Sequence, residues 1–547
     1  MTSPLAVPGA TSLSAERRDR DLDTLAGGAR VDLLVVGLGV TGAGVALDAA
    51  SRGLSVAAVD AHDLAYGTSR WSSKLVHGGV RYLASGDIPL AYESAVERDI
   101  LLRRTAPHLV TPLPFALALT PMVTRAQGGL ARLGVTAADL LRAAAGTPRA
   151  YLPRPRRATA TEVRRLVPRV RRDGLRGGLV HWESQLVDDA RLVVALARTA
   201  AGYGARILTG CRAERLYADG ADVVSTPTGG SAPTGGGAGG GGAGGGGAGG
   251  GGAGGDRWRI RARAVVNATG VWAGQLDPTI RLRPSRGTHI VLPPGALGHP
   301  AAALTVLVPG TASRFVIAVP QPDGRIYAGL TDEPVADVQD VPEPTEDEIG
   351  FLLAVFNTAL DPPVRRDEVI GAFAGLRPLL AGAGDRTVDL SRRHAVHRSP
   401  DGVVTVIGGK LTTYRRMARD AVDAAAAGAG LPVTACRTRR LPLVGAAPPD
   451  RLAVVPAPAR LVARYGTEAP DVVAGAGGDP DLLAPIADGI DVTGAELLWA
   501  VRHEGARDPG DLLDRRTRIG LVPADRDRAL PAARAALAHE GLATGRA

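Results

Sequence analysis

The apolar and polar positions of this chain form a regular pattern from residue 31 onward. Residues 1–29 mix arginine and aspartate with isolated apolar positions, which predicts a flexible tail. An apolar run at Val31–Val36 is followed by a glycine-rich turn, an alanine-rich segment and a second apolar run at Ser55–Val59. This order predicts a strand, a helix and a second strand, which is the βαβ unit of a parallel sheet.

The same periodicity places further elements. Apolar residues have helical spacing in 88–106, 188–204 and 345–359, and the last segment opens with a capping sequence from Thr345 to Glu348. Alternating runs predict strands at 205–209, 221–225, 257–261 and 403–407, with several short strands across 260–330. Beyond residue 431 the chain is arginine-rich and is predicted to be helical.

Residues 229–255 are almost pure glycine and alanine in a GGGGA repeat. Such a segment buries too little apolar surface to offset its ordering entropy, so we expect a flexible coil. It lies between two predicted strands, 221–225 and 257–261, and therefore reads as an enlarged hairpin tip.

Composition narrows the class of partner. The 547 residues carry a formal net charge of +9, which favours a phosphorylated substrate, an acidic membrane surface or a nucleic acid. No nucleic acid is expected, because the basic residues are not interleaved with aromatic ones, which make up only 3% of the chain. Cys211 and Cys436 lie far apart without metal-binding spacing, so no metal is expected and a reducing cytoplasm is favoured.

We expect neither a secretory signal nor a membrane span. Residues 1–30 lack an apolar core segment, and the most apolar stretch, Leu33–Leu47, is broken by four glycines. The protein is expected to be cytoplasmic, either soluble or peripheral on the inner face of the cell membrane. Two groups of arginines are candidates for lipid contact or are ordinary surface charges: those of 149–176, and Arg502, Arg507, Arg515, Arg516 and Arg518.

A glycine-rich turn joins the first predicted strand to the first predicted helix. It runs from Gly37 to Gly42 as GLGVTG, with another glycine at position 44. In a dinucleotide-binding turn the first glycine permits the bend, the second admits a pyrophosphate, and the third lets helix and strand pack closely. Asp60, at the end of the second strand, has the spacing of a carboxylate that binds ribose hydroxyls. The pattern predicts a dinucleotide but does not distinguish NAD from FAD.

Lysine is rare in this chain. Of the 64 lysines and arginines only two are lysines, Lys74 in SSKL and Lys410 in GGKL. Lysine is a compact point charge where arginine is a broad planar fork, so both positions are expected to be narrow or chemically particular. The alternative is that the two lysines have no special function and are left over from the codon bias that favours arginine in this chain.

Residues 66–83 read YGTSRWSSKLVHGGVRYL, a composition typical of a loop around a flat polar cofactor. This stretch resembles the signature GTSSRSSKLIHGGLRYL of the FAD-dependent glycerol-3-phosphate dehydrogenases. Residues 403–416 and 373–379 resemble that family's C-proximal flavin motif and its substrate-arginine motif, and 265–270, 284–289 and 329–332 agree further. The resemblance runs from about residue 30 to the C-terminus. Trp71, Leu330 and the glycine-alanine segment depart from the family pattern.

The resemblance implies an α/β fold of the glutathione-reductase type. We expect an FAD-binding Rossmann domain in 30–110, 175–275 and 372–430, an interleaved antiparallel-sheet substrate domain in 111–174 and 276–371, and a C-terminal helical domain in 431–547. The residues implied for FAD binding are Gly37, Gly39, Thr41, Gly42, Asp60, Thr68, Ser69, Ser73, Lys74, His77, Gly78, Gly79, Ala268, Thr269, Gly270, Gly408, Gly409, Lys410, Leu411 and Thr412.

The implied reaction is oxidation of sn-glycerol 3-phosphate to dihydroxyacetone phosphate by hydride transfer to FAD. A dianionic phosphate calls for cationic groups, and we assign Arg81, Arg377 and Lys410 to this role. Loss of the hydroxyl proton needs a base, and the residues present do not rank the two candidates, His77 and His289. Tyr82 is expected to complete the pocket by hydrogen bonding.

The family resemblance also implies attachment to the membrane and quinone as the electron acceptor. Three alternatives stay open: an oxidase that uses oxygen, a relative that acts on amino acids or other hydroxy acids, and a non-catalytic flavin-binding protein. The sequence does not fix the oligomeric state, so a homodimer also stays open.

Overall fold

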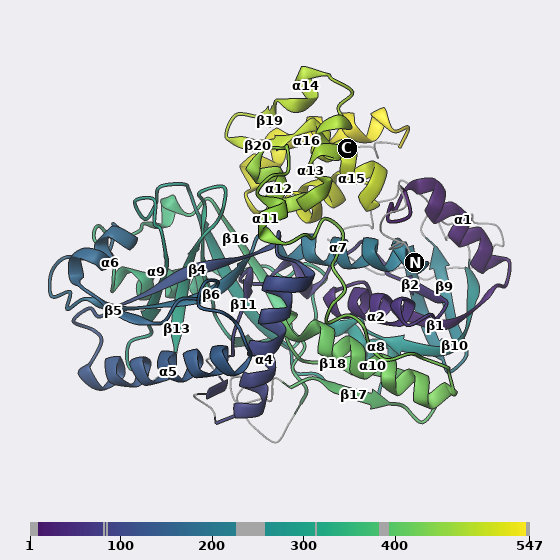
Figure 1. Cartoon of the computed structure of the whole chain (residues 1–547), viewed down its shortest axis with the longest axis horizontal. Coiled ribbons are helices and arrows are strands. Elements are labelled where there is room, and N and C mark those ends of the chain that lie inside the picture. Colours follow the sequence, from purple (N-terminus) through teal and green to yellow (C-terminus); the bar gives the residue numbers. More distant parts are fainter. Residues whose placement is uncertain are drawn as a thin grey trace, which may run out of the picture.

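The computed structural model describes residues 9–79, 82–83, 86–225, 257–311, 314–381 and 393–542. Two sheets lie side by side, and the C-terminal helices pack above the junction between them (Figure 1). The glycine-alanine segment at 229–255 and Arg81 lie outside the described residues. Within the described part, no helix has the length and apolar character needed to cross a membrane.

The first sheet has a parallel centre. In the described residues it has eight strands in the order β17-β18-β10-β1-β2-β7, with β9 paired to β10 and β8 to β9. The predicted strand–turn–helix–strand unit is confirmed as β1, α2 (Val40–Ser51) and β2. The bounds are β1 Arg30–Val36, β2 Val56–Val59, β7 Arg206–Leu208, β8 Cys211–Tyr217, β9 Gly220–Ser225, β10 Arg257–Asn267, β17 Ala395–Arg398 and β18 Val404–Ile407.

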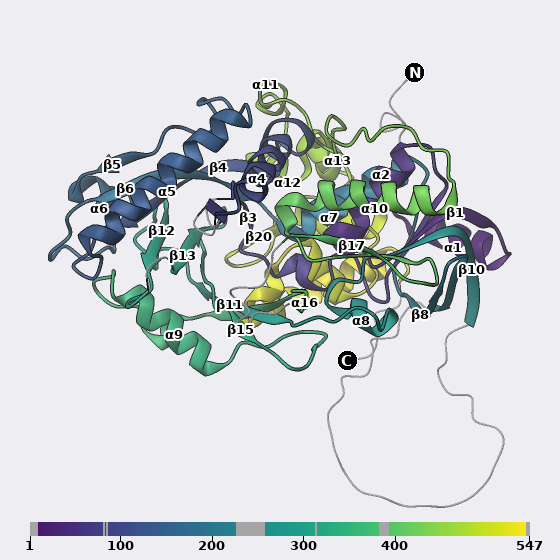
Figure 2. The same ribbon diagram turned by 90° about the horizontal axis from the view of Figure 1, so that it is seen from below.

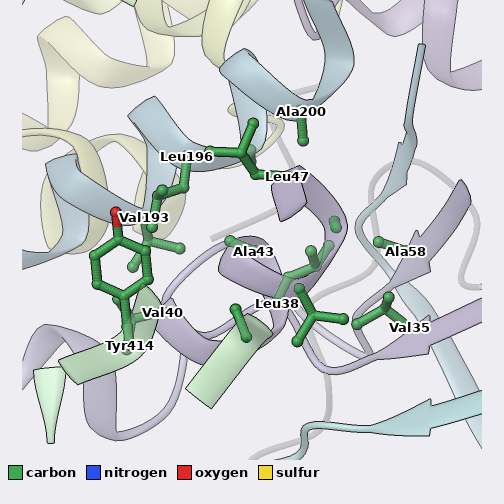
Figure 3. Close-up of a cluster of buried hydrophobic side chains, with 14 of the residues drawn as sticks. Val35, Leu38, Val40, Ala43, Leu47, Ala58, Val193, Leu196, Ala200 and Tyr414 are labelled. Atoms are coloured by element: carbon green, nitrogen blue, oxygen red, sulfur yellow. The ribbon is translucent and has the colours of Figure 1, made fainter. Parts of the chain in front are cut away.

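Three helices cover one face of this sheet. Leu196 and Ala200 of α7 (Asp189–Gly202) pack toward Leu47 of α2, and Tyr414 begins α10 (Tyr414–Ala429) beside the same core (Figure 3). A Cβ at Gly44 would lie 2.8 Å from the Tyr414 ring. The additional glycine of the turn motif therefore lets α10 approach α2 closely.

The second sheet is mostly antiparallel. Among the described residues it has ten strands in the order β15-β11-β14-β13-β12-β4-β6-β3, with β16 beside β11 and β5 beside β6. Helices α4, α5, α6 and α9 flank it (Figures 1 and 2). The strand bounds are β3 Leu75–Val76, β4 Val110–Ala118, β5 Arg156–Ala158, β6 Gly178–Leu186, β11 Ser285–Leu292, β12 Ala303–Leu307, β13 Phe315–Pro320, β14 Ile326–Gly329, β15 Glu333–Pro334 and β16 Gly371–Arg377.

Strands β3, β6 and β16 belong to the second sheet although they fall in ranges that the sequence assigned to the cofactor domain. The chain therefore crosses repeatedly between the two sheets. The predicted hairpin around the glycine-alanine segment is confirmed, because Val224 of β9 pairs with Arg257 of β10. The remaining helices around the sheets are α4 Ile88–Ile100, extended by a π-helical turn Leu101–Thr105, α5 Arg125–Ala144, α6 Ala160–Leu166, α8 Ala273–Leu276 and α9 Glu346–Asn357.

The prediction of a flexible tail was wrong for residues 15–26, which form α1 (Ala15–Ala26). Ser14 caps this helix by accepting the N–H of Arg17, and Leu25 is completely buried in the core of the first sheet. The Arg18 guanidinium donates to the Thr209 carbonyl oxygen. The many charged residues of this segment concealed a helix with one narrow apolar edge.

The C-terminal region is helical, as predicted, with one small hairpin. Its elements are α11 Pro449–Leu452, α12 Ala459–Tyr465, α13 Ala469–Ala474, α14 Pro480–Leu483, β19 Pro485–Ala487, β20 Ile490–Thr493, α15 Gly494–Glu504, a π-helical turn Asp511–Arg516 and α16 Pro523–His539.

Arg515, Arg516 and Arg518 are buried or nearly so, and neither expectation for them, lipid contact or ordinary surface charge, was right. The guanidinium groups of Arg515 and Arg516 both bind the Asp63 carboxylate at 2.7 Å, and Arg518 pairs with Asp188 at 3.2 Å. All five side chains are buried or nearly so, and they join the C-terminal helices to the first sheet.

Candidate active site

The glycine turn has the geometry that a pyrophosphate needs. Gly37 has a φ of +98°, and a Cβ there would lie 2.7 Å from the Ala268 carbonyl oxygen. A Cβ at Gly42 would lie 1.7 Å from the Gly37 carbonyl oxygen, so only glycine allows α2 to begin here. At Gly39 a Cβ would meet only the Ser69 hydroxyl, which leaves open space beside the first N–H groups of α2.

Other predicted cofactor residues border this turn. The Asp60 carboxylate accepts the N–H of Leu38 at 2.7 Å, and burial raises the pKa of Asp60 to about 6. The Thr269 hydroxyl donates to Asn267 Oδ1 at 2.7 Å, at the end of β10 next to the turn. Two further residues predicted to bind FAD are Thr41 and Gly270. Thr41 is the second residue of α2, and Gly270 has a φ of +61° with open space where a Cβ would lie.

Residues 66–79 connect the glycine turn to the second sheet. The Ser69 hydroxyl accepts the first N–H of α2 at 2.9 Å, and the Thr68 hydroxyl donates to the Leu376 carbonyl oxygen at 2.7 Å. Ser73 Oγ lies 2.9 Å from His289 Nε2 of β11. The loop therefore links the glycine turn to β11 and β16, the strands that carry the predicted catalytic residues His289 and Arg377.

Lys74 is completely buried beneath this loop. Its ammonium donates to Asp189 Oδ2 at 2.8 Å, and the same oxygen accepts the N–H and the hydroxyl of Ser72. Burial lowers the pKa of Lys74 to about 8, although Asp189 favours the charged form. These contacts make Lys74 a support of the loop, tied to the start of α7.

His77 and the two glycines after it pack against α4 and β6. The N–H of Gly78 donates to Glu183 Oε2 at 3.0 Å, which also accepts from Arg98 at 2.9 Å. A Cβ at Gly78 would lie 2.1 Å from the Arg98 guanidinium, and Gly79, at φ +86°, lies against the α4 backbone. Burial would raise the pKa of Glu183, but the charges of Arg98 and His77 lower it below its usual value.

Lys410 lies over an aromatic ring. Its Nζ is 4.1 Å from the ring centroid of Tyr82, which is 6% exposed. Gly408 and Gly409, at φ +75° and +69°, form the turn before it. Lys410 is followed by a 3-10 turn, Leu411–Thr413, and then by α10, and this turn packs against β3 and α4. Thr412 within the turn is buried.

The guanidinium of Arg377 is held in one orientation at the end of β16. It donates to the Thr331 carbonyl oxygen at 3.0 Å, to Ser285 Oγ at 3.1 Å and to Asp332 Oδ1 at 3.2 Å. A Cβ at Gly287 would lie 2.1 Å from this guanidinium. The glycine of β11 therefore leaves room for the arginine.

His289 is 2% exposed on β11 and stacks on Phe373 of β16, with ring centroids 4.8 Å apart. Burial, together with the positive charges of Lys74 and Arg377, lowers the pKa of His289 to about 3. The imidazole is therefore neutral near pH 7.

Residues 73–77 bring the two halves of the predicted site together. Ser73 contacts His289, which lies within electrostatic range of Arg377, while β3 packs against the turn that follows Lys410. Sequence reasoning missed two buried carboxylates, Asp189 and Glu183, that hold this segment. The only signal for Asp189 was its place at the start of a predicted helix, and Glu183 gave none.

Comparisons with known proteins agree with this geometry. Residues 32–415 match the family model described as FAD dependent oxidoreductase, and residues 436–543 match the C-terminal domain of alpha-glycerophosphate oxidase. Glycerol-3-phosphate dehydrogenase 1 of Mycobacterium tuberculosis is 50% identical over 97% of this chain and 99% of its own length. The mitochondrial glycerol-3-phosphate dehydrogenase SDP6 of Arabidopsis thaliana is 33% identical over 90% of this chain and 80% of its own.

The fold also matches a solved structure. The glycerol-3-phosphate dehydrogenase of Bacillus halodurans complexed with FAD superposes with a TM-score of 0.71 at 25% identity, covering 96% of this chain and 94% of that one. The open space at Gly39 and the short residues beside the start of α2 fit the same cofactor. The chain therefore belongs to the FAD-dependent glycerol-3-phosphate dehydrogenase family.

Proposed function

We propose that this enzyme converts sn-glycerol 3-phosphate to dihydroxyacetone phosphate and passes the electrons to a quinone, working as a peripheral protein on the inner face of the cell membrane. The supporting observation is the junction at 73–77, which contacts the Arg377 side of the site through Ser73 and the Lys410 side through β3. Two separate sources of positive charge then border one cofactor loop, as a small phosphate ester requires.

Arg377 and Lys410 serve the phosphate in different ways. Arg377 offers a planar fork whose orientation is fixed by Ser285, Asp332 and the Thr331 carbonyl oxygen. Lys410 is a point charge on the Tyr82 ring, which stabilises the cation without neutralising it. Arg81, next to Tyr82 in sequence, completes the proposed set.

His77 is the better candidate for the base. Protonation of His289 is opposed by burial and by two nearby cations, Lys74 and Arg377. His77 instead interacts with the buried Glu183 carboxylate, and such a neighbour stabilises the imidazolium that forms when the hydroxyl proton is taken up. His289 then acts with Ser73 to hold the wall of the site.

FAD would be held by the glycine turn, Asp60, Ser69 and the Gly408–Thr412 segment, and when bound it supplies the acceptor for the hydride of the secondary alcohol. The chain itself orients the alcohol, balances the phosphate charge and removes the proton.

Anaerobic addition of sn-glycerol 3-phosphate to the holoenzyme tests the substrate. The flavin absorbance should bleach with this ester and stay unchanged with glycerol, which lacks the phosphate. Arg377→Gln should abolish bleaching at matched flavin content, while Arg365→Gln, which alters an exposed pair with Asp367, should not. Unchanged bleaching by Arg377→Gln would refute the assignment.

The acceptor needs a separate measurement, because the C-terminal segment matches a domain described for an oxidase. Turnover under air without an added acceptor should give little hydrogen peroxide, and a short-chain quinone should restore turnover. Stoichiometric peroxide would instead identify the enzyme as an oxidase.

A further inference from the structure

Helix α5 is an exposed amphipathic element on the outside of the second sheet. It is 20 residues long, and Arg142 is the single member of the helix that is buried. Seen from below, no other element lies in front of it, and it lies on the side of the molecule away from the C-terminal helices (Figures 1 and 2).

The outward face of α5 is apolar. Leu130, Leu133 and Leu140 are 53%, 67% and 69% exposed and follow helical spacing. The other exposed residues of α5 are two arginines and five small residues: Arg125, Arg132, Ala126, Gly129, Thr136, Ala143 and Ala144. Of the nine large apolar side chains exposed in the described residues, six lie within 88–140, so the concentration is local. Those six, Ile88, Tyr92, Met122, Leu130, Leu133 and Leu140, define the α4–α5 face.

The helix is weakly supported by the protein interior. Gly128, Gly129 and Gly134 lie inside it, and each lowers helix stability by about 1 kcal/mol relative to alanine. The Thr124–Gln127 capping box and the bond from Gln127 to the Thr311 carbonyl oxygen fix one end. An apolar surface outside the protein would stabilise the remaining turns.

Positive charge borders this face. Arg125 and Arg132 on the helix and Arg149 just after it are exposed, and none has an ion pair within the described ranges. The one aspartate of the helix, Asp139, is bound to Arg142 at 2.6 Å. Unpaired arginines around an apolar ridge match the headgroups and acyl boundary of an anionic bilayer.

The face is also connected to the catalytic site. Leu141, on the inner side of α5, packs against the buried cluster of Tyr82, Leu90 and Ala91. Tyr82 is the residue under the Lys410 ammonium. A surface that rests on α5 therefore lies next to the loop at which a membrane-soluble acceptor must be reduced.

We propose that the α4–α5 face rests on the surface of an anionic lipid bilayer. This inference rests on the proposed use of quinone. Contact through this face would place the active site beside the bilayer, in which long-chain quinones dissolve. A second copy of the chain fits less well, since the one carboxylate of α5, Asp139, is already bound to Arg142 and would not pair with Arg125 or Arg132 across a two-fold contact.

Flotation of the holoenzyme with lipid vesicles tests the proposal. The unmodified enzyme should float with vesicles of phosphatidylcholine containing phosphatidylglycerol, and less with phosphatidylcholine alone or at high salt. The double variant Leu133→Gln/Leu140→Gln should bind about tenfold more weakly or worse, because two exposed leucines lose their burial in lipid. Val454→Gln/Leu483→Gln alters two exposed apolar residues of the C-terminal region and should bind normally.

Turnover with a soluble dye or a short-chain quinone should be equal in all three proteins, while turnover with a long-chain quinone in the vesicles should fall only in the α5 variant. Equal flotation of the α5 and control variants, or no flotation of the unmodified enzyme, would overturn the proposal. The proposal would also be overturned if light scattering showed that the unmodified enzyme is a dimer and the α5 variant is a monomer. That result would assign the face to contact with a second copy of the chain. Failure to use any quinone despite normal flotation would count against the acceptor alone.

Discussion

The two lysines of this chain lie in similar sequence surroundings, SSKL and GGKL, yet the structure gives them different environments. Lys74 is fully buried, and its ammonium binds Asp189 at 2.8 Å. Lys410 is half-buried, and its ammonium lies on the face of Tyr82. The first therefore belongs to a buried ion pair and the second to a cation–aromatic contact, a difference that local sequence does not reveal.

The difference arises from residues that are distant in sequence. Asp189 lies 115 positions after Lys74 and is brought there because α7 packs under the loop. Lys410 lies over the Tyr82 ring, and this aromatic face supports its cation. Two lysines in similar sequence surroundings thus have different environments because of their neighbours in the fold.

The largest expected effect comes from breaking the Lys74 side. Lys74→Met keeps the volume but leaves the buried Asp189 carboxylate without a cation at Oδ2, where only the neutral donors of Ser72 remain, which should destabilise the fold by about 3–5 kcal/mol. Flavin release during a urea titration measures this loss. Adding Asp189→Leu to Lys74→Met should recover part of it, and purely additive losses would contradict the buried pair.

Lys410→Met should have the opposite profile. We expect kcat/KM for sn-glycerol 3-phosphate to fall by about 100-fold, as for a phosphate contact worth 2–3 kcal/mol, with unchanged flavin content and an unchanged urea midpoint. Lys410→Arg should restore little, because a planar fork does not replace a point charge over the Tyr82 ring. A lowered urea midpoint with normal kcat/KM would place Lys410 among the structural charges.

The sequence predicted those parts that contiguous residues determine. The turn at Gly37–Gly42, the capping box at Thr345 and the hairpin pairing of β9 with β10 all follow from neighbouring residues, and the structure confirms them. Contacts between residues that lie hundreds of positions apart left no such signal in the sequence. Arg515 and Arg516 form buried ion pairs with Asp63, but in the sequence they cannot be told from the surface arginines of an arginine-rich chain.

His77 interacts electrostatically with the buried Glu183 carboxylate. Glu183→Gln keeps an acceptor for the Gly78 N–H but removes the carboxylate, so the imidazolium at His77 loses its stabilising charge. The acid limb of the kcat/KM profile should therefore move to lower pH by about one unit. Asp332→Asn, which changes the partner of Arg377, is the matched control and should leave the limb in place. A limb that does not move with Glu183→Gln would remove His77 as the base.

The smallest effect concerns His289, which lies between the Lys74 and Arg377 charges. Its pKa is about 3 in the folded protein, against an ordinary value near 6.5. Between these values the unfolded chain binds a proton that the folded protein excludes, so this group makes stability fall as pH drops from 6.5 toward 3. His289→Gln should remove this contribution, at most about 1.4 kcal/mol per pH unit, as measured by urea midpoints from pH 6.5 to 4.5. In the Lys74→Met background the contribution should shrink, because one of the two cations that oppose protonation is gone. Identical pH dependence in the unmodified enzyme and in His289→Gln would show that His289 is protonated as easily in the fold as in the unfolded chain.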